Sequence, residues 1–338
     1  MARDLTLIIV GFGAVGQALA HKIQLSHGDV GVGGQRVRVV GIADSKSSVF
    51  SRDGLDLGKM VDLKKKEGAV GKIGSPSGFE MIGKADADVL VELASAGGQD
   101  GEPGLSRMLE ALDRGMHVVS SNKMPLAVAY SSLMKKAGAE QRMLRYGACV
   151  GAGIPVLEFA DACMASDQVR TIRGVLNATS NYIVTKMEVD GTSFERALHD
   201  AQTAGFAEAD PSLDIKGVDA ACKAVILGNH VLGRNFVLKD VKELDGIDGV
   251  SPQQIKEAKA GAKKIRMVAT VDRVPRITLV ELPYDDPLAV DGARNAVVFH
   301  CEISGDRYIG GEGAGGPKTS QAVFRDIRAI AASQKGGS

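Results

Sequence analysis

The chain has 338 residues, which is long enough for two domains and a sizeable hydrophobic core. Its 41 basic and 41 acidic residues balance, and this argues against a non-specific partner of nucleic acid or of a membrane surface. Aromatic residues make up only 4% and tryptophan is absent, so a stacking platform for single-stranded nucleic acid is not expected.

The cysteines and histidines are dispersed along the chain. The four cysteines form no Cys-x-x-Cys pair, which predicts reduced thiols and a cytoplasmic location. The six histidines form no metal-ligand spacing. There is no apolar run of eighteen residues, so no membrane span is expected. The N-terminus imitates a signal peptide, but Asp4 and three glycines interrupt the pattern.

Those glycines belong to a recognisable turn. A continuous apolar run over 5–10 predicts a strand buried on both faces, and 17–25 has helical character. Between them lies a Gly-x-Gly-x-x-Gly turn, the dinucleotide-binding fingerprint. Its glycines permit a tight turn, close approach of the backbone to a pyrophosphate, and packing of helix on strand. The predicted cofactor contacts here are Gly11, Phe12, Gly13, Ala14, Val15 and Gly16; the alternative is a plain strand-to-helix turn.

A second predicted strand, 36–42, is followed by Asp44, Ser45 and Lys46. The fingerprint places an acid near this strand end to accept hydrogen bonds from the ribose hydroxyls. Asp44 lies further from the glycine turn than the fingerprint expects, and an inserted loop over 28–35 explains the difference. The alternative is that Asp44 is an ordinary turn residue. Lys46 or Arg52 offers a charge for a 2′-phosphate, so the sequence leaves NAD and NADP open.

Two further buried strands are predicted over 88–93 and 117–120, with helices over 105–114 and 126–138. In open α/β sheets, ligands bind at the carboxyl ends of the strands. The residues predicted to contact the cofactor at this edge are Ala94, Ser95, Ser121, Asn122 and Lys123. A solvated loop lysine is the alternative for Lys123. The polar stretch 51–85 carries Lys64, Lys65 and Lys66, which are read as a solvated face.

The character of the chain changes after a glycine-rich region at 147–155. The expected strands are 171–176, 296–303 and 306–309, with further β-rich runs over 266–282 that include 277–280. The expected helices are 182–188, 194–204 and 319–332. These elements predict a mixed or antiparallel sheet with helices on it. The fold class is therefore α/β, with a Rossmann-type doubly wound nucleotide-binding domain over 1–147, completed by 310–338, and an α+β domain over 148–309.

The stretch 205–223 concentrates charge. It holds four acids and two lysines, and Pro211 and Gly217 predict that its first half is a loop. After Gly217 an apolar helix carries Asp219 and Lys223 four residues apart on one face. The plain interpretation is an exposed ion pair; the alternative is a lysine held in a pocket by a carboxylate.

Taken together, the motifs resemble those of the homoserine dehydrogenase family over nearly the whole length. In the family's order they are the Gly11–Gly16 turn, 120–123 (SSNK), 150–155 (VGAGIP), 174–183 (GVLNATSNYI), 207–223 and 313–316 (GAGG). The resemblance implies reversible reduction of L-aspartate 4-semialdehyde to L-homoserine with NADPH or NADH, a step in threonine and methionine biosynthesis. It also implies a homodimer whose contacts lie in the 148–309 domain. The chain ends before the family's optional regulatory domain, so feedback inhibition by threonine is not expected.

The resemblance also implies roles for individual residues. Lys123 and Lys223 correspond to the catalytic pair, and Asp219 to the partner of Lys223. Glu208 and Asp214 correspond to the clamp for the substrate ammonium, Thr179 to a further substrate contact and Gly313 to a cofactor contact. A monovalent cation is held in the family partly by backbone carbonyls, here those of Val150, Ala152 and Ile154. One departure stands out: Gly147 occupies the position where the family usually has a glutamate ligand.

Two other functions are compatible with the sequence. One is a different amino-acid or semialdehyde dehydrogenase on the same scaffold, although a thioester-forming enzyme would need a paired cysteine and histidine. The other is a nucleotide-binding sensor without catalysis.

Overall fold

The structure is a computed structural model that describes residues 3–31, 34–75, 77–94 and 98–334. The chain forms two compact units. Unit 1 contains residues up to Cys149 together with those from Gly315 onward, and unit 2 contains Val150–Ala314. Within the described residues, no helix is both long enough and apolar enough to cross a membrane.

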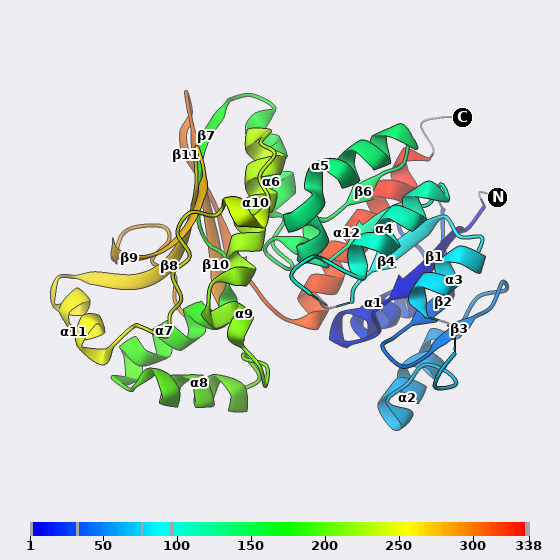
Figure 1. Cartoon of the computed structure of the whole chain (residues 1–338), viewed down its shortest axis with the longest axis horizontal. Coiled ribbons are helices and arrows are strands. Elements are labelled where there is room, and N and C mark those ends of the chain that lie inside the picture. Colours follow the sequence, from blue (N-terminus) through cyan, green and yellow to red (C-terminus); the bar gives the residue numbers. More distant parts are fainter. Residues whose placement is uncertain (1–2, 32–33, 76, 95–97, 335–338) are drawn as a thin grey trace. The chain divides into compact units, whose positions relative to one another are not determined.

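Unit 1 is built on a six-stranded sheet in the order β3-β2-β1-β4-β5-β6 (Figure 1). All neighbours are parallel except β2 and β3, which are antiparallel. The strands are β1 (Leu5–Val10), β2 (Val37–Ala43), β3 (Ser48–Phe50), β4 (Val89–Glu92), β5 (His117–Ser120) and β6 (Leu144–Arg145). Every residue of β1 is buried, as expected for a central strand covered on both faces.

Helices cover both faces of this sheet, so the predicted doubly wound architecture is confirmed. On one face α1 and α12 pack together, although they lie at opposite ends of the chain (Figure 1, blue and red). The helices of unit 1 are α1 (Ala14–Leu25), α2 (Leu57–Glu67), α3 (Gly78–Lys84), α4 (Gly104–Asp113), α5 (Lys123–Ala139) and α12 (Gly316–Ser333), with the 3-10 turn η1 (Gly147–Cys149).

The parallel register brings the strand ends to one edge. Val10 is paired with both Ala43 and Glu92, and Glu92 is paired with Ser120. The segments that follow β1, β2, β4 and β5 therefore all begin at the same edge, where ligands bind in sheets of this kind.

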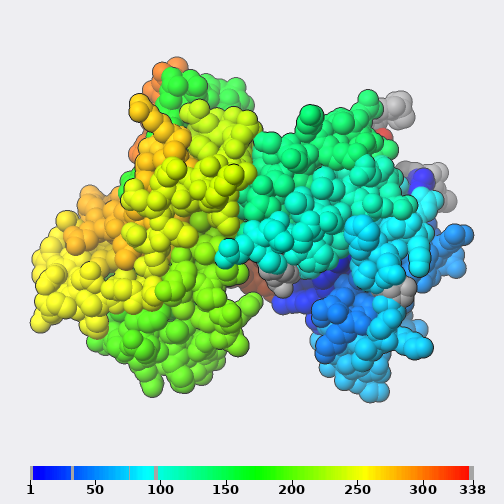
Figure 2. All heavy atoms as spheres, in the orientation of Figure 1, coloured from blue at the N-terminus to red at the C-terminus, as the bar shows by residue number. Residues whose placement is uncertain are grey.

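The polar stretch 51–85 contains two helices that the sequence analysis missed, α2 and α3. Asp56 caps α2 by accepting a hydrogen bond from the Lys59 amide at 3.1 Å, and Gly68 ends the helix in a left-handed conformation. Ser77 and Glu80 form a reciprocal capping box at the start of α3. In the space-filling view, the blue segment around α2 forms a projection on the surface of unit 1 (Figure 2).

Unit 2 contains a five-stranded antiparallel sheet in the order β11-β10-β7-β8-β9. Its strands are β7 (Val169–Val175), β8 (Lys263–Val271), β9 (Pro275–Pro283), β10 (Arg294–Cys301) and β11 (Gly305–Glu312). Its helices are α6 (Val156–Met164), α7 (Ala178–Asp190), α8 (Phe194–Thr203), α9 (Ser212–Ile215), α10 (Val218–Leu232) and α11 (Pro252–Ala260), with the 3-10 turn η2 (Leu238–Asp240). Helix α10 packs on β7, β8 and β9, and eleven of its fifteen residues are buried.

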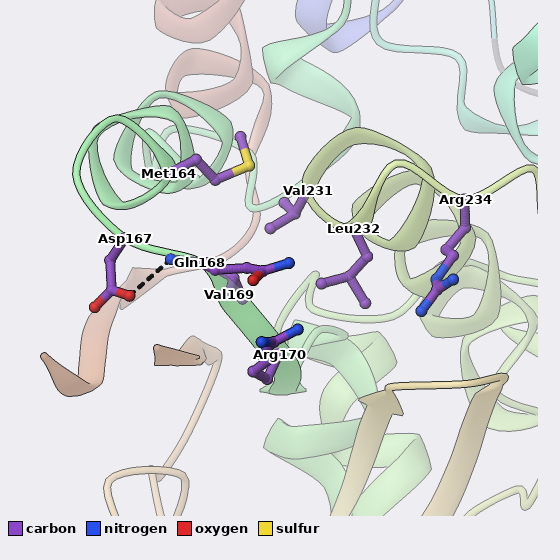
Figure 3. Close-up of a pocket in the computed structure, with 8 residues that line it drawn as sticks. All are labelled: Met164, Asp167, Gln168, Val169, Arg170, Val231, Leu232 and Arg234. Atoms are coloured by element: carbon purple, nitrogen blue, oxygen red, sulfur yellow. Dashed lines mark hydrogen bonds between the residues drawn. The ribbon is translucent and has the colours of Figure 1, made fainter. Parts of the chain in front are cut away.

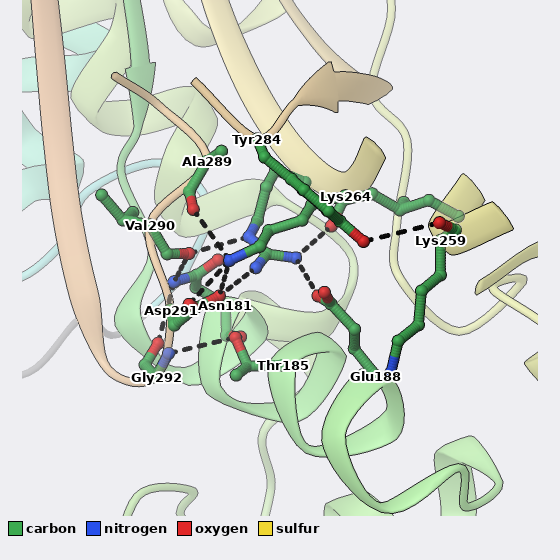
Figure 4. A network of polar contacts seen from close by, with 12 residues as sticks. Asn181, Thr185, Glu188, Lys259, Lys264, Tyr284, Ala289, Val290, Asp291 and Gly292 are labelled. Carbon is green, nitrogen blue, oxygen red and sulfur yellow. Dashed lines mark hydrogen bonds and ion pairs between the residues drawn. The ribbon is translucent and has the colours of Figure 1, made fainter. Parts of the chain in front are cut away.

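A polar clamp in unit 2 holds the β9–β10 connection to the sheet and to α7 (Figure 4). At its centre is Arg266 on β8, whose side chain is 0% exposed. Its guanidinium contacts a carboxylate oxygen of Glu188 at 3.1 Å and one of Asp291 at 2.6 Å, and donates to the Val290 carbonyl at 2.8 Å. Asn181 on α7 donates to the carbonyls of Val290 and Gly292. The clamp therefore fixes α7, which begins beside the residues described next.

Candidate active site

The glycine turn after β1 has the geometry that a nucleotide-binding loop requires. Gly11 has a φ of +97°, and a Cβ at this position would lie 2.4 Å from the Ala94 backbone nitrogen. A Cβ on Gly16 would lie 2.4 Å from the Gly11 carbonyl oxygen, so helix and strand can approach only without side chains. A Cβ on Gly13, by contrast, would have no described atom within 4 Å apart from its chain neighbours and its own helix. Gly13 also precedes the first turn of α1, and no side chain caps that turn.

These features fit a dinucleotide, because the open space lies where the backbone approaches a pyrophosphate and the helix dipole favours negative charge. The second glycine-rich segment lies against the same turn: a Cβ on Gly316 would lie 2.9 Å from the Ala14 backbone. Gly313, which the sequence analysis assigned to the cofactor, belongs to unit 2 and packs on the Asn295 side chain.

We expect Gly11→Ala and Gly13→Ala to weaken cofactor binding for different reasons. Gly11→Ala strains the backbone by about 1–3 kcal/mol and should lower both stability and affinity. Gly13→Ala should leave the unfolding temperature unchanged but raise the Kd for NADPH at least about tenfold, because the methyl group fills the approach of the phosphates. Fluorescence titration and thermal unfolding measure the two quantities.

Gly138→Ala is the matched control, since Gly138 is exposed on helix α5 with open space around it. It should stabilise unit 1 slightly, by about 0.5–1 kcal/mol, and leave cofactor binding unchanged. Wild-type affinity in Gly13→Ala would contradict the assignment of this turn.

Asp44 follows β2, and both of its carboxylate oxygens have partners within the protein. One carboxylate oxygen accepts hydrogen bonds from the backbone amides of Lys46 and Ser47, each at 2.7 Å. The other lies 2.7 Å from the Lys64 ammonium. Burial opposes ionisation of Asp44, but these hydrogen bonds outweigh it and hold its pKa below the usual value. Lys64 is therefore not part of a solvated face, because its stem is largely buried and its charge neutralises the acid at the strand end.

The end of β4 carries a buried ion pair with α4, which the sequence did not predict. Arg107 on α4 contacts both carboxylate oxygens of Glu92, at 2.7 and 2.9 Å. The same carboxylate accepts from the Ala94 amide at 3.2 Å. Burial raises the pKa of Glu92 against the effect of Arg107. The available signal for this pair was an acid at the end of the otherwise apolar strand β4.

Helix α5 begins at Lys123 rather than at residue 126, so Asn122 occupies its N-cap position. The Asn122 side chain makes no capping hydrogen bond, and its backbone N–H donates to the Ser120 hydroxyl at 3.0 Å. The Ser121 N–H donates to the Glu92 carbonyl, which joins the two strand ends. Ala94 lies at this edge too, whereas Ser95 falls outside the described residues.

In unit 2 two acids of the 205–223 stretch, Asp219 and Asp214, lie in the cluster around Lys223. The plain interpretation of an exposed ion pair is wrong, because the side chains of Lys223 and Asp219 are only 9% and 12% exposed. The ammonium of Lys223 donates to Asp219 Oδ2 and to the Leu176 carbonyl, both at 2.6 Å. Helix α10 buries the stem of the lysine among apolar neighbours, so its charge is fixed in one place.

Two more of the residues assigned to the site lie nearby. Asp214 is on the short helix α9 and accepts a 2.5 Å hydrogen bond from the Asn177 amide. Thr179, in the first turn of α7, donates to the Phe206 carbonyl at 2.9 Å. Glu208 differs, because its side chain is exposed and no hydrogen bond or ion pair of its carboxylate is found among the described residues. The structure thus joins Lys223, Asp219 and Asp214, but not Glu208.

The residues suggested for a cation do not form a charged site. Gly147 has no side chain, and its N–H donates to Asp326 Oδ2 at 2.8 Å. The Ile154 carbonyl already accepts from the Val156 amide at 2.8 Å. Across the described part of the chain, no group of three or more His, Cys, Asp or Glu residues is arranged to hold a metal.

A cavity of about 270 Å³ lies elsewhere in unit 2, at the ends of α6 and α10 (Figure 3). Arg170 and Arg234 line it together with apolar side chains such as Val231 and Leu232. None of the residues assigned to the site from the sequence lines this cavity. It is therefore separate from the cluster around Lys223.

Comparison with known proteins identifies the family of the chain. A family model described as homoserine dehydrogenase matches residues 155–327, and one described as the NAD-binding domain of homoserine dehydrogenase matches 11–147. The chain belongs to the homoserine dehydrogenase family. It is 35% identical over 326 residues to a homoserine dehydrogenase of Methanocaldococcus jannaschii, covering 95% of this chain and 97% of the relative.

Two further relatives bear on the cofactor. An NAD(+)-dependent homoserine dehydrogenase of Pseudomonas canavaninivorans is 33% identical, with 95% of this chain and 94% of the relative covered. A hyperthermophilic archaeal homoserine dehydrogenase in complex with NADPH superposes with a TM-score of 0.85 at 28% identity, covering 98% of each chain. The homoserine dehydrogenase fold expected from the motifs is therefore confirmed.

Proposed function

We propose that Lys123, Lys223, Asp219 and Asp214 carry the chemistry of an NAD(P)-dependent homoserine dehydrogenase. The activity and the cofactor class follow from membership of the family. The observation that supports the roles of the residues is the buried Lys223 ammonium, which is held at 2.6 Å by Asp219 beside Asp214. The nicotinamide, when bound to unit 1, supplies or accepts the hydride.

The residues perform the part of the reaction that involves charge and protons. Reduction of the aldehyde builds negative charge on its oxygen, and a fixed ammonium group stabilises this charge and delivers a proton. Lys223 has this role, and Asp219 keeps its ammonium oriented. Lys123 supplies the second positive charge. Asp214, with Glu208, binds the α-ammonium group of the substrate, and Thr179 is a further contact.

The test is turnover of L-homoserine by the full chain with NADP⁺ and with NAD⁺, followed by the absorbance of the reduced nicotinamide. We expect reduced cofactor to form with homoserine. Cofactor binding without turnover would instead support a nucleotide-binding sensor, and turnover only with another amino alcohol would support a different dehydrogenase. All four cysteines are buried, which does not favour a thioester-forming enzyme.

We expect Lys64→Met to shift the cofactor preference toward NADH. Lys64 neutralises Asp44, so its removal leaves a carboxylate that repels a 2′-phosphate. The Kd for NADPH should rise about tenfold relative to that for NADH, which corresponds to about 1.4 kcal/mol. Lys65→Met is the control, because Lys65 is exposed on the same helix. An unchanged ratio of the two Kd values would remove Lys64 from the choice of cofactor.

We expect turnover to be independent of the monovalent cation. Gly147 removes the charged ligand and the Ile154 carbonyl is already engaged, so the remaining carbonyls bind a cation weakly. Replacing sodium chloride with tetramethylammonium chloride at equal ionic strength should change kcat less than about twofold. A tenfold loss, restored by sodium or potassium, would show that a cation site operates without the acid.

The domain roles, quaternary state and location complete the proposal. Unit 1 binds the nucleotide, and unit 2 holds the substrate and the contacts of a homodimer, as in the family the motifs resemble. Light scattering on the purified chain measures the oligomeric state. The four reduced thiols and a biosynthetic role fit the cytoplasm.

A further inference from the structure

We propose that Asn177 is a positioning residue that joins the carboxylates of Asp214 and Asp219 through a single amide group, and so sets the geometry around Lys223. This inference rests on the proposed function. In the sequence Asn177 appears only within the 174–183 motif, without a role of its own.

The local fold explains why a capping residue stands here. Asn177 lies between β7 and α7 with an extended backbone, and its side-chain Oδ1 accepts a hydrogen bond from the Ser180 amide at 2.7 Å. Its side chain is almost completely buried. Serine, threonine or aspartate can cap a helix equally well, so the cap alone does not account for an amide at this position.

The amide nitrogen of Asn177 explains why an asparagine stands here. Nδ2 donates to Asp214 Oδ1 at 2.5 Å and to Asp219 Oδ2 at 2.8 Å. An amide nitrogen has two hydrogens, and both are used. One side chain therefore connects three elements, the start of α7, the short helix α9 and the first turn of α10. Two carboxylates that would otherwise repel each other share one donor.

The link continues to the lysine. Asp219 Oδ2, the oxygen that Asn177 contacts, also accepts from Lys223 Nζ at 2.6 Å. The Leu176 carbonyl, directly before Asn177, accepts from Lys223 and from the Asn295 amide at 3.2 Å. An ammonium group has three hydrogens, so these two acceptors fix the direction of the third. Asn177 thereby holds Asp219, one partner of Lys223, and directly follows Leu176, whose carbonyl is the other partner.

The hydrogen bonds from Asn177 also affect the ionisation of Asp214 and Asp219. Hydrogen bonds donated to a carboxylate favour its ionised form, so loss of the Asn177 amide raises the pKa of Asp219 and Asp214. Their negative charge is then lost at a higher pH than in the wild type. The acidic limb of the pH profile of kcat/KM should move upward, whereas cofactor binding in unit 1 should not change.

The experiment compares Asn177→Ser and Asn177→Asp, both of which retain a capping oxygen. For Asn177→Ser we expect kcat/KM for homoserine to fall about a hundredfold and the acidic limb to move up by about one pH unit. Asn177→Asp places a third carboxylate beside the other two, so the fall and the shift should be at least as large. The Kd for NADPH should equal that of the wild type in both.

Asn229→Ser is the matched control. Asn229 is an equally buried asparagine on α10, but its amide contacts only the backbone of Phe236 among the described residues. Its replacement should lower the unfolding temperature without moving the acidic limb. If Asn177→Ser behaves like Asn229→Ser, with reduced stability and a wild-type pH profile, the proposal is overturned.

A second measurement separates this proposal from the function on which it rests. The carboxyl carbon chemical shifts of Asp214 and Asp219 are titrated in the wild type and in Asn177→Ser by NMR. Raised pKa values in an enzyme that does not turn over homoserine would retain the link and reject the proposed function. Unchanged pKa values would reject the link, whatever the activity.

Discussion

Replacement of Lys223 by methionine is expected to lower kcat/KM for homoserine about a thousandfold, with little change in the Kd for NADPH. Methionine has a similar length and suits the apolar surroundings on α10, so the fold should persist. What is lost is the charge that stabilises the developing oxyanion and the proton that neutralises it, and general acid catalysis contributes about 10²–10⁴-fold. Initial rates with saturating cofactor measure the effect.

Lys216→Met is the control for this variant. Lys216 lies in the same charged stretch, but its side chain is 62% exposed and it pairs with Asp248 away from the Lys223 cluster. Its replacement should leave kcat/KM within about twofold of the wild type, because an exposed ion pair contributes little to the stability of the fold. Equal activity of Lys223→Met and Lys216→Met would exclude Lys223 as the acid.

Replacement of Arg266 by methionine is expected to cost about 3–5 kcal/mol of the free energy of unfolding, because it breaks a buried ion pair. Glu188, with its side chain 13% exposed, would keep a charge without its partner, and the Val290 carbonyl would lose a donor. Asp291 suffers less, since it is more exposed and also pairs with Lys264 at 2.7 Å. The midpoint of urea unfolding, followed through unit 2, measures the loss.

The double variant Arg266→Met with Glu188→Gln identifies the cause. It removes the stranded charge, so it should be more stable than Arg266→Met alone by at least about 1 kcal/mol. Arg170→Met is the surface control, because Arg170 and its partner Glu302 are about half exposed. A loss equal to that of Arg170→Met would mean that the clamp contributes little.

The sequence was most informative where hydrophobic pattern and glycine spacing act together. The strand 5–10 and the strand 117–120 have in the structure the bounds that the pattern predicts. The parallel pairing of β1, β2, β4, β5 and β6 also follows, since strands joined by helical crossovers pair in parallel. Helix starts were less accurate: α1 begins at Ala14 and α5 at Lys123, because first turns carry glycine or polar residues that hide the periodicity.

The helices that were missed bury few side chains but have capping signals. Helix α2 has a single buried residue, so its sequence shows almost no periodicity. Its signals are Asp56 before it and Gly68 after it. Helix α11 begins with Ser251, Pro252 and Gln254, a capping box with proline at the first position. Attention to caps would have found these helices.

For the site, the sequence named Lys223, Asp219 and Asp214, which lie close together in the structure, but it did not show how they are connected. The spacing of Asp219 and Lys223 predicts that they share a helix face, yet only the packing of α10 shows that the pair is buried. Asn177 contacts Asp214 and Asp219, which lie 37 and 42 positions further along the chain. No local pattern reports such a contact, because it depends on how α7, α9 and α10 meet.

The four buried cysteines give the two units separate reporters. Cys149 lies in unit 1, whereas Cys163, Cys222 and Cys301 lie in unit 2. A thiol reagent reaches them only when the surrounding structure opens, so labelling rates report local opening. Cys222 directly precedes Lys223 on α10, and its rate of modification during turnover therefore records how often α10 exposes its buried face.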